Sequence, residues 1–559
     1  MRNDDGVETP DTPARAPVEV ATPQAVPTRQ PTPPDSSVPI PHSALRTPHS
    51  LAADLRALLR DSQIVAAPAE LRTFAYDASF MTQLAPQAPD VAVIAGSEDD
   101  VCALMRYAAE RGIPVTPRGA ASGQAAGSVA LEGGIVLSLN ALNRVLEIDV
   151  PNLQAFCEPG VVHAQLNQQL LPHKLVFPPD PGSSRMATVG GMASTNAHGM
   201  RAVKYGPTGA WVLGLHVVLP DGRLIETGSV GSRAKQSSAG LELTKLFVGA
   251  EGTLGVITRL RLKLMTIPPA RAIVTASFDE LEGAGRAVQA VFGAGVSPSA
   301  IEILDERCIQ AINLYRPAMG LPPVEALLLF EVDGNPPGVR WDAELVAEVV
   351  RPLACAVEWS DEPGRIAALW EARSLVGAAI GALRPGANRA YCGEDLCVPV
   401  ARMPETLRAI QDISARYRIP IATYGHIGGG GLHPGHLIDA RDLDEVRRVL
   451  IVADEIHDLA LRMGGTVTGE HGVGAVRAPY MRREHGLALD TMRDIKRALD
   501  PRGIMNPGKI FAPQPPTGAE PPLPDRAGEE PLDEARQIAV AEPAEVPRGP
   551  RLSTPSLEV

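Results

Sequence analysis

The fold is decided around one glycine-rich turn, Pro117-Arg-Gly-Ala-Ala-Ser-Gly-Gln124. Its glycines stand where a backbone has to turn sharply, so that amide N–H groups can approach a diphosphate without a side chain between them. The turn does not match the G-x-G-x-x-G fingerprint, so a nicotinamide Rossmann site is not indicated. Taken alone, the turn has a second interpretation, because a tight turn without any ligand is at least as common as a phosphate cradle.

Strands and helices alternate on both sides of this turn. We predict a helix over residues 51–59, a buried strand over residues 91–95, and an amphipathic helix over residues 99–111. Apolar or alternating runs bounded by turn residues predict further strands over residues 134–139, 145–149, 213–219, 224–226 and 256–264.

A domain boundary is expected at Pro268-Pro269. Beyond it, short strands over residues 272–278 and 326–331 alternate with helices over residues 281–292 and 341–350. This order of elements is an α+β pattern.

The composition excludes several classes of protein. Apolar residues make up 45% and charged residues 21%, which is ordinary for a soluble globular protein. The 52 Lys and Arg against 65 Asp and Glu give a net charge of −13, which opposes attraction to nucleic acid or anionic lipid. No run of about 18 apolar residues occurs and the N-terminus carries Asp4 and Asp5, so a membrane span and a secretory signal are both disfavoured.

The six cysteines are scattered and lack the C-x-x-C spacing of zinc or redox sites. We therefore expect reduced thiols in a cytoplasmic protein. Because the cysteines do not form an iron–sulfur motif either, any such centre would have to be on another chain.

Both ends of the chain are rich in proline and have neither helical nor strand periodicity. Residues 1–50 and 512–559 cannot bury enough apolar surface to offset their chain entropy. We expect both segments to be disordered tails.

Further motifs follow the glycine-rich turn along the chain. They are Pro178-Pro-Asp-Pro-Gly-Ser-Ser184, Thr188-Val-Gly-Gly191, Asn196, Lys204-Tyr-Gly206 and Phe247-Val-Gly-Ala-Glu-Gly-Thr-Leu-Gly255. With them, the chain from Leu51 to Phe511 closely resembles the FAD-linked oxidases of the vanillyl-alcohol oxidase and p-cresol methylhydroxylase superfamily. The resemblance is to the branch that contains D-lactate dehydrogenase (cytochrome), D-2-hydroxyglutarate dehydrogenase and the flavin subunit of glycolate oxidase.

The resemblance implies an α+β fold of two domains. Residues 51–267 would form a PCMH-type FAD-binding domain made of two subdomains. Residues 268–480 would form an α+β substrate (cap) domain, with an antiparallel sheet and a metal site. Residues 481–511 would return to the FAD domain.

The resemblance also implies which residues contact FAD. They are Pro117, Arg118, Gly119, Ala120, Ala121, Ser122, Gly123, Gln124, Pro181, Gly182, Ser183, Ser184, Thr188, Gly190, Gly191, Asn196, Glu251, Gly252, Ile257 and Asn506. Many relatives read Gly-Ala-Gly-Thr-Gly in the first loop, whereas this chain keeps a small residue and a hydroxyl at Ala121-Ser122. Some members of the superfamily tether flavin through a His in this loop, and none occurs between Val115 and Val129. We predict non-covalent FAD.

Two glycine-rich segments in the C-terminal half carry imidazoles and a carboxylate. The segment His426-Ile-Gly-Gly-Gly-Gly-Leu-His433 sets two His seven residues apart, and Gly464-Gly-Thr-Val-Thr-Gly-Glu-His-Gly472 places Glu470 beside His471. Two His and one Glu can hold a Zn²⁺-like ion and leave a position open for substrate. The alternative is that these histidines only satisfy backbone groups, which both segments together make less probable.

In the resembling enzymes the two His and the Glu bind metal, and the next His takes the hydroxyl proton. By position, His426, His433 and Glu470 would be metal ligands and His471 the base. Arg373, in Leu369-Trp-Glu-Ala-Arg-Ser374, would grip the substrate carboxylate through two parallel hydrogen bonds. The alternative is that Arg373 is an arginine on the solvent-exposed face of a helix and has no role in substrate binding.

Asn506 belongs to the motif Asn506-Pro-Gly-Lys509. The resemblance places it near the isoalloxazine ring. A plain turn containing Pro and Gly is the alternative interpretation of this tetrapeptide.

The chain departs from the relatives at two places. They usually read His-x-Gly-Asp-Gly-Asn-x-His, but Gly429 and Gly431 replace the Asp and the Asn. Loss of the Asn removes a polar contact worth on the order of 1 kcal/mol, so either another side chain compensates or the substrate differs. Residues 391–399 lack the lysine that dicarboxylate-oxidising relatives often carry, which favours a monocarboxylate such as lactate or glycolate.

The expected function is FAD-dependent oxidation of a small D-2-hydroxy acid to the 2-oxo acid, assisted by a divalent metal, for which the ligand types favour Zn²⁺. The electron acceptor would be a quinone, a cytochrome or an electron-transfer protein. Three alternatives stay open: the flavin subunit of a multi-subunit glycolate oxidase, a flavin-dependent transferase of the alkylglycerone-phosphate synthase type, and a catalytically inactive binding protein. Peripheral attachment to the inner face of a membrane and homodimerisation are also left open.

Overall fold

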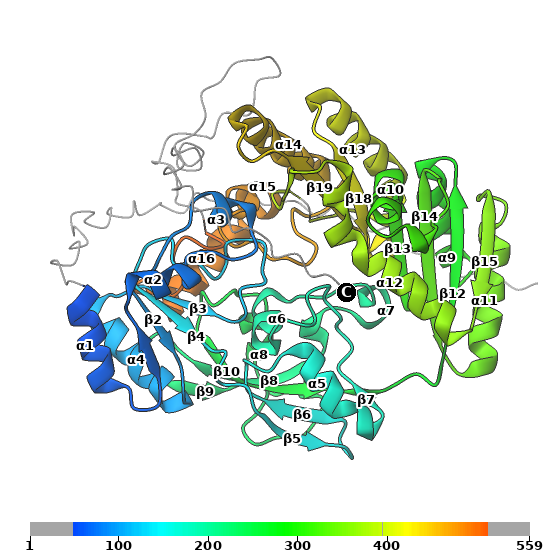
Figure 1. The fold of residues 1–559 in the computed structure, drawn as a ribbon. Coiled ribbons are helices and arrows are strands. Elements are labelled where there is room, and N and C mark those ends of the chain that lie inside the picture. Colours follow the sequence, from blue (N-terminus) through cyan, green and yellow to red (C-terminus); the bar gives the residue numbers. More distant parts are fainter. Residues whose placement is uncertain (1–47, 394, 512–559) are drawn as a thin grey trace, which may run out of the picture. The chain divides into compact units, whose positions relative to one another are not determined.

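The computed structural model describes residues 48–393 and 395–511. The predicted tails, residues 1–50 and 512–559, lie outside these ranges except for residues 48–50, which begin the first helix. All predicted strands and helices of the described part are found, and the α+β class is confirmed (Figure 1).

A four-stranded sheet follows the N-terminal helices. Its order is β1-β2-β4-β3, in which β2 and β3 each run parallel to β4. Helix α4 begins where the Ser97 hydroxyl accepts the Asp100 N–H at 3.2 Å, and it ends at Gly112 with φ +62°. The elements are α1 (Pro48–Leu58), β1 (Gln63–Val65), α2 (Pro68–Leu71), α3 (Phe80–Leu84), β2 (Val91–Ile94), α4 (Glu98–Arg111), β3 (Val115–Arg118) and β4 (Ile135–Ser138).

A five-stranded antiparallel sheet comes next, in the order β5-β6-β10-β8-β9. Its core includes Leu166 of α5 and Val189 of α6. The elements are β5 (Val145–Asp149), β6 (Gln154–Cys157), α5 (His163–Leu170), β7 (Leu175–Val176), α6 (Val189–Thr195), α7 (Ala202–Tyr205), β8 (Val212–Val218), β9 (Leu224–Glu226), α8 (Leu243–Phe247), β10 (Val256–Lys263) and β11 (Met265–Thr266), with β7 and β11 forming a separate pair.

The C-terminal half is built on an eight-stranded antiparallel sheet of order β15-β12-β14-β13-β18-β19-β16, with β17 also paired to β19. Its strands are β12 (Ala270–Phe278), β13 (Ala300–Asp305), β14 (Ala326–Gly334), β15 (Ala356–Ser360), β16 (Asn388–Ala390), β17 (Leu396–Cys397), β18 (Ile421–Gly425) and β19 (Gly431–Ile438). Its helices are α9 (Leu281–Gly293), α10 (Glu306–Tyr315), α11 (Pro336–Val350), α12 (Pro363–Ala379), α13 (Met403–Tyr417) and α14 (Leu443–Arg462). The helices α15 (Met481–His485) and α16 (Ala488–Leu499) follow.

Successive side chains of the central strands enter two different cores. On β14, Leu328 and Phe330 pack with residues of α9, α11, α13 and α14, whereas Leu329 packs with residues of α12. Because side chains alternate along a strand, Glu331 of β14 and Glu302 of β13 fall on the α12 side of the sheet. This alternation decides which face of the sheet carries the polar site.

Helix α11 begins earlier than its apolar periodicity predicted. The expected start was residue 341, and the helix starts at Pro336. Prolines at the first two helical positions cost nothing there, because their missing N–H groups would have no partner within the helix.

Helix α12 continues into a 3-10 turn, and residues 363–383 are long and apolar enough for a membrane span by composition. Ile366, Leu369 and Val376 are, however, buried in the cores beside the sheet, as in a core helix. The six cysteines are free thiols, as expected.

The large sheet packs against a core on each face, which predicts how substitutions change stability. Phe330→Ala, at a side chain that is 0% exposed, should lower the free energy of unfolding by about 3–5 kcal/mol through the cavity it leaves. Trp341→Ala removes a larger ring that is 68% exposed and should change it by less than about 0.5 kcal/mol. Urea unfolding measures both, and equal losses would show that Phe330 is not in the core.

Candidate functional site

The hairpin β18–β19 carries both histidines of the first glycine-rich segment. Tyr424 and His433 are paired across the hairpin, and His426 follows β18 directly. The connection is tight: Gly430 has φ +86°, and a Cβ there would lie 2.1 Å from the carbonyl oxygen of Val398. Glycine is required at this position, and the sharp turn brings the two imidazoles together.

Two imidazoles and one carboxylate meet at a single oxygen. Oε1 of Glu470 lies 3.3 Å from Nε2 of His426 and 3.3 Å from Nε2 of His433. The rings of the two histidines are 5.0 Å apart and nearly perpendicular, so both direct a nitrogen to the same point. The three residues that were predicted as metal ligands are therefore brought together, 44 and 37 residues apart in sequence.

His471, the predicted base, lies at the edge of this cluster. Its Nε2 is 3.5 Å from Oε1 of Glu470, and its ring stacks on that of His433 with centroids 5.2 Å apart. Its backbone N–H donates to Oδ2 of Asp395 at 2.8 Å. The His471 side chain is 19% exposed, against 9% for Glu470 and 5% for His433.

Glu302 supports the cluster from the sheet side and was not predicted. This fully buried carboxylate lies 2.7 Å from Nδ1 of His426 and 2.6 Å from Nη2 of Arg373. A carboxylate at Nδ1 keeps a proton on that nitrogen and leaves Nε2 directed at Glu470. Glu302 stands in an otherwise apolar strand, so no motif marks it.

The charges of the cluster depend on one another. Burial lowers the pKa of His426, but the carboxylates of Glu302 and Glu470 outweigh it and raise that pKa to about 10. Burial would raise the pKa of Glu470, yet the charge of His426 and three imidazole hydrogen bonds hold it well below its usual value. Burial lowers the pKa of His433. The cluster without a bound ion therefore pairs a carboxylate with a protonated His426.

Asp395 and His198 also belong to the site and were not predicted. Asp395 accepts hydrogen bonds from the Thr468 hydroxyl at 2.6 Å and from the Glu470 and His471 amides, and the nearby histidine and Arg477 charges lower its pKa against its burial. Burial lowers the pKa of His198, which also senses the charges of Glu470 and His426. Both lie outside the two segments that were recognised, although the sequence around residue 395 matches the family.

Arg373 is not a solvated helix arginine, so that alternative is wrong. Its side chain is 7% exposed, its Nε donates to Oε2 of Glu302 at 2.7 Å, and its Cζ lies 4.7 Å from the centroid of the Tyr424 ring. The ion pair holds one edge of the guanidinium and leaves the Nη1 side for another ligand.

The glycine-rich turn of the N-terminal half fits an anionic cofactor. Ala121, where relatives have glycine, takes φ +55°, a left-handed conformation that costs roughly 1–2 kcal/mol for a residue with a Cβ. A Cβ at Gly119 would lie 2.6 Å from Oγ1 of Thr188, whereas one at Gly123 would meet nothing within 4 Å. Oε1 of Gln124 is buried with no hydrogen-bond partner among the described residues. The tight turn and the open space leave room for a phosphate beside the backbone amides, and the Gln124 oxygen needs a donor group, which the uncharged part of a cofactor can supply.

Several residues that are expected at FAD also make hydrogen bonds within the protein. The Arg118 guanidinium donates to the carbonyls of Thr73, Tyr76 and Ser128, so only its backbone faces the turn. Asn506 donates to the carbonyls of Gly127 and Glu251. Further expected residues fold this region locally: Thr188 caps α6 by accepting the Gly191 N–H, and Asn196 accepts the Gly209 N–H at 2.8 Å.

Glu251 joins the N-terminal half to the segment that carries Glu470 and His471. Its carboxylate accepts the N–H groups of Val473 and Gly474, each at 2.7 Å, and burial raises its pKa. Gly474 has φ +51°, and a Cβ there would lie 1.8 Å from the carbonyl oxygen of Ala125. The segment that carries Glu470 and His471 therefore packs backbone to backbone against Ala125, directly after the glycine-rich turn.

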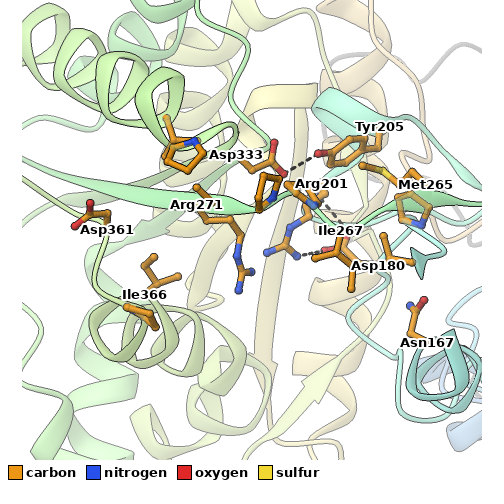
Figure 2. A pocket seen from close by; sticks show the side chains of 18 of the residues that line it. Asn167, Asp180, Arg201, Tyr205, Met265, Ile267, Arg271, Asp333, Asp361 and Ile366 are labelled. Carbon is orange, nitrogen blue, oxygen red and sulfur yellow. Dashed lines mark hydrogen bonds and ion pairs between the residues drawn. The ribbon is translucent and has the colours of Figure 1, made fainter. Parts of the chain in front are cut away.

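A cavity of about 670 Å³ lies beside this region, lined by residues of both halves of the chain. Figure 2 shows Arg201 next to Asp180, and Tyr205 next to Asp333, in its wall. His426, His433 and Glu470 are not among the described residues that line it. Charged groups of its wall pair with one another, as Arg201 does with Asp180 at 2.6 Å and Arg340 with Asp361 at 2.8 Å, and the cavity is distinct from the cluster.

Comparison with known proteins agrees with this geometry. Residues 89–228 match the family model "FAD binding domain", and residues 267–510 match "FAD linked oxidases, C-terminal domain". The chain is 37% identical over 444 residues to the glycolate oxidase subunit GlcD of Bacillus subtilis, covering 78% of this chain and 92% of that protein. It is 36% identical to a probable mitochondrial D-lactate dehydrogenase of Danio rerio, covering 76% and 84%. A crystal structure of p-cresol methylhydroxylase with substrate bound shares the fold, with a TM-score of 0.71 at 17% identity over 84% of this chain and 98% of that one.

The Glu251 contact can be tested directly. Glu251→Ala removes both acceptors, so amide hydrogen exchange in a peptide covering residues 470–476 should become roughly ten- to a hundredfold faster. Glu242→Ala removes a carboxylate that caps α8 and should leave this peptide unchanged. If hydrogen exchange of this peptide is unchanged in Glu251→Ala, the Glu251 carboxylate does not hold the segment in place.

Proposed function

Since this chain belongs to the FAD-linked oxidase family, we propose that it oxidises a small D-2-hydroxy acid to the 2-oxo acid, using non-covalent FAD and a divalent metal ion. The observation that carries the proposal is the convergence of Nε2 of His426 and Nε2 of His433 on one oxygen of Glu470. The two curated relatives are named for the oxidation of glycolate and of D-lactate, which are both 2-hydroxy acids.

The spacing of the cluster supports a metal ion. Two ligand atoms that are each about 2.0–2.1 Å from a tetrahedral Zn²⁺ lie about 3.3 Å apart. Both histidine nitrogens are 3.3 Å from Oε1 of Glu470. The other oxygen, Oε2, is buried without a hydrogen-bond partner among the described residues, as expected of a carboxylate that has a cation to bind.

A second group of potential ligands shares His433 and consists of Asp395, His433 and His471. Its distances are longer, 4.0 Å from Asp395 to His433 and 3.7 Å from Asp395 to His471. The Asp395 oxygens already accept one hydroxyl and two amide hydrogen bonds. The geometry therefore favours His426, His433 and Glu470 as the ligands and leaves His471 for proton transfer.

Each residue around the cluster has a separate proposed role in the reaction. Bound FAD supplies the hydride acceptor, and a divalent ion supplies the positive charge that lowers the pKa of an α-hydroxyl. Glu302 fixes the His426 ring through Nδ1, so that its Nε2 stays directed at the ligand position. Arg373 can take the substrate carboxylate on the edge that Glu302 does not hold. His471, partly exposed beside the cluster, accepts the hydroxyl proton at Nε2.

The electron acceptor is proposed to be a quinone, a cytochrome or an electron-transfer protein. The relative that is named as a subunit raises the alternative that this chain is one flavin subunit of a larger glycolate oxidase. Copurification of an iron–sulfur protein with the full chain would favour that alternative.

Metal content tests the ligand assignment. The purified protein should hold about one divalent ion per chain, and His433→Ala and Glu470→Gln should each lose it while keeping bound FAD. Elemental analysis together with the flavin absorbance measures both. His173→Ala, at an exposed histidine outside the cluster, is the control that should keep the ion. Full metal content in His433→Ala would place the ion elsewhere.

Anaerobic mixing with D-lactate, glycolate and D-2-hydroxyglutarate tests the reaction. At least one should bleach the flavin band, and His471→Ala should slow that bleaching roughly a hundred- to ten-thousandfold without loss of FAD. Normal reduction by the variant would refute the base assignment. If the unmodified protein is indifferent to every 2-hydroxy acid, the oxidation proposal fails, and a flavin-dependent transferase or a binding protein takes its place.

A further inference from the structure

A buried histidine outside the cluster, His163 at the first position of α5, contacts the segment that is expected to wrap FAD. Its Nδ1 lies 2.7 Å from the hydroxyl oxygen of Ser184. The two backbones are also joined, since the His163 N–H donates to the carbonyl of Ala187 at 2.9 Å. His163 is 3% exposed, so this contact belongs to the interior of the protein.

Ser184 belongs to a segment that reaches the proposed cofactor cradle. Farther along this segment, Thr188 packs against Gly119 of the glycine-rich turn, where a Cβ would lie 2.6 Å from the threonine hydroxyl oxygen. A Cβ built at Gly182 would meet nothing within 4 Å, so there is open space beside the segment. Ser184 is itself only half-buried. Its hydroxyl can therefore bond to His163 on one side and to a ligand on the other.

Asn167, also on α5, decides which ring nitrogen of His163 carries the proton. Its side-chain oxygen accepts the Phe177 N–H at 2.8 Å, which fixes the orientation of the amide. The amide nitrogen lies 3.0 Å from Nε2 of His163 and 3.2 Å from the Phe177 carbonyl oxygen. The contact of Nε2 with the same carbonyl is longer, at 3.3 Å. Because an amide NH₂ can only donate, it bonds to the lone pair of an unprotonated Nε2.

The single proton of the His163 ring is therefore on Nδ1. Burial lowers the pKa of His163 and outweighs the carbonyls of Phe177 and Pro179, so the ring is neutral at about pH 7. Nδ1 then donates to the Ser184 oxygen, and the serine directs its own hydrogen away from the ring. In the opposite tautomer Ser184 would donate to Nδ1 and would offer a ligand only lone pairs.

We infer that His163 is a positioning residue for the cofactor, because through Nδ1 it makes Ser184 a hydrogen-bond donor to an oxygen of FAD. The inference rests on the proposed binding of FAD. The polar atoms of FAD are mostly acceptors, namely the diphosphate oxygens and the carbonyls of the isoalloxazine ring, so a donor suits them and a lone pair does not. Hydrogen bonds thus run in one direction, from Asn167 through His163 to Ser184, and each strengthens the next.

The half-buried Asn167 lines the large cavity, at whose edge Figure 2 shows it. His163 lines the same cavity. The sequence did not mark either residue, because α5 and the FAD segment approach each other only in the fold.

The Kd of FAD tests the inference, measured from the flavin fluorescence that is released when the purified protein is diluted. Ser184→Ala should raise this Kd roughly five- to fiftyfold, and His163→Leu roughly three- to tenfold. In the Ser184→Ala background, His163→Leu should add less than about twofold, since the two residues act through one hydrogen bond. His163→Asn should recover most of the affinity, because its amide nitrogen can take the place of Nδ1 and still donate. His173→Leu changes an exposed histidine elsewhere and is the matched control.

Nitrogen-15 NMR of histidine-labelled protein reads the tautomer directly. The signals that disappear in His163→Asn should be those of a neutral imidazole that is protonated at Nδ1 and unprotonated at Nε2. A role confined to packing would not require this tautomer.

The midpoint potential of the bound flavin tells the two kinds of FAD oxygen apart. A hydrogen bond to a ring carbonyl stabilises the reduced flavin, which carries more negative charge, so Ser184→Ala should lower the potential if the ring is the acceptor. If the diphosphate is the acceptor, Kd rises in Ser184→Ala while the potential stays the same.

The outcomes separate this inference from the proposed function. If the unmodified protein holds no FAD, the proposed function fails. If FAD binds, but Ser184→Ala and His163→Leu bind it as tightly as the unmodified protein, the positioning role is wrong while the oxidation stands. Additive effects of the two substitutions, or an unprotonated Nδ1, would overturn that role in the same way.

Discussion

The site depends on one buried carboxylate, that of Glu302. Moving a charge out of water is costly unless it is paired and hydrogen-bonded, and Glu302 is satisfied by His426 at 2.7 Å and by Arg373 at 2.6 Å. It thereby binds three elements to one another: the strand β13 on which it stands, the β18–β19 connection and the helix α12. The alternation of side chains along the sheet directs it to the α12 face, so the orientations of His426 and Arg373 are both consequences of strand register.

A second set of contacts holds the segment that carries Glu470 and His471 next to the glycine-rich turn. Glu251 accepts two amides of the segment that follows His471, and Gly474 approaches Ala125 too closely for any side chain. The C-terminal segment adds contacts of its own, since Lys496 donates to the carbonyl of Thr253 and Lys509 to that of Val129. A proposed cofactor cradle and a proposed metal site, more than 300 residues apart in sequence, are therefore held together by hydrogen bonds from side chains to backbone and by the close backbone approach of Gly474 to Ala125.

Local pattern was enough for the fold and for part of the site. Apolar periodicity located part of the strands and helices but not β13, α12, β18 and β19, which carry the site, and two glycine-rich segments located His426, His433 and Glu470. Periodicity missed the first turn of α11, because prolines interrupt the pattern but not the helix. It also missed Glu302 and Asp395, whose importance arises only when strands distant in sequence pair. Arg373 was identified, but its ion pair with Glu302 could not be, because the two residues meet only in the fold.

The central claim is that these elements converge to hold one ion. X-ray diffraction from crystals of the metal-loaded protein, recorded above and below the absorption edge of the metal, tests it most directly. The account predicts one anomalous peak about 2 Å from Nε2 of His426, from Nε2 of His433 and from a carboxylate oxygen of Glu470. A peak coordinated by other residues, or fully loaded protein in which these three side chains bind no ion, would contradict it.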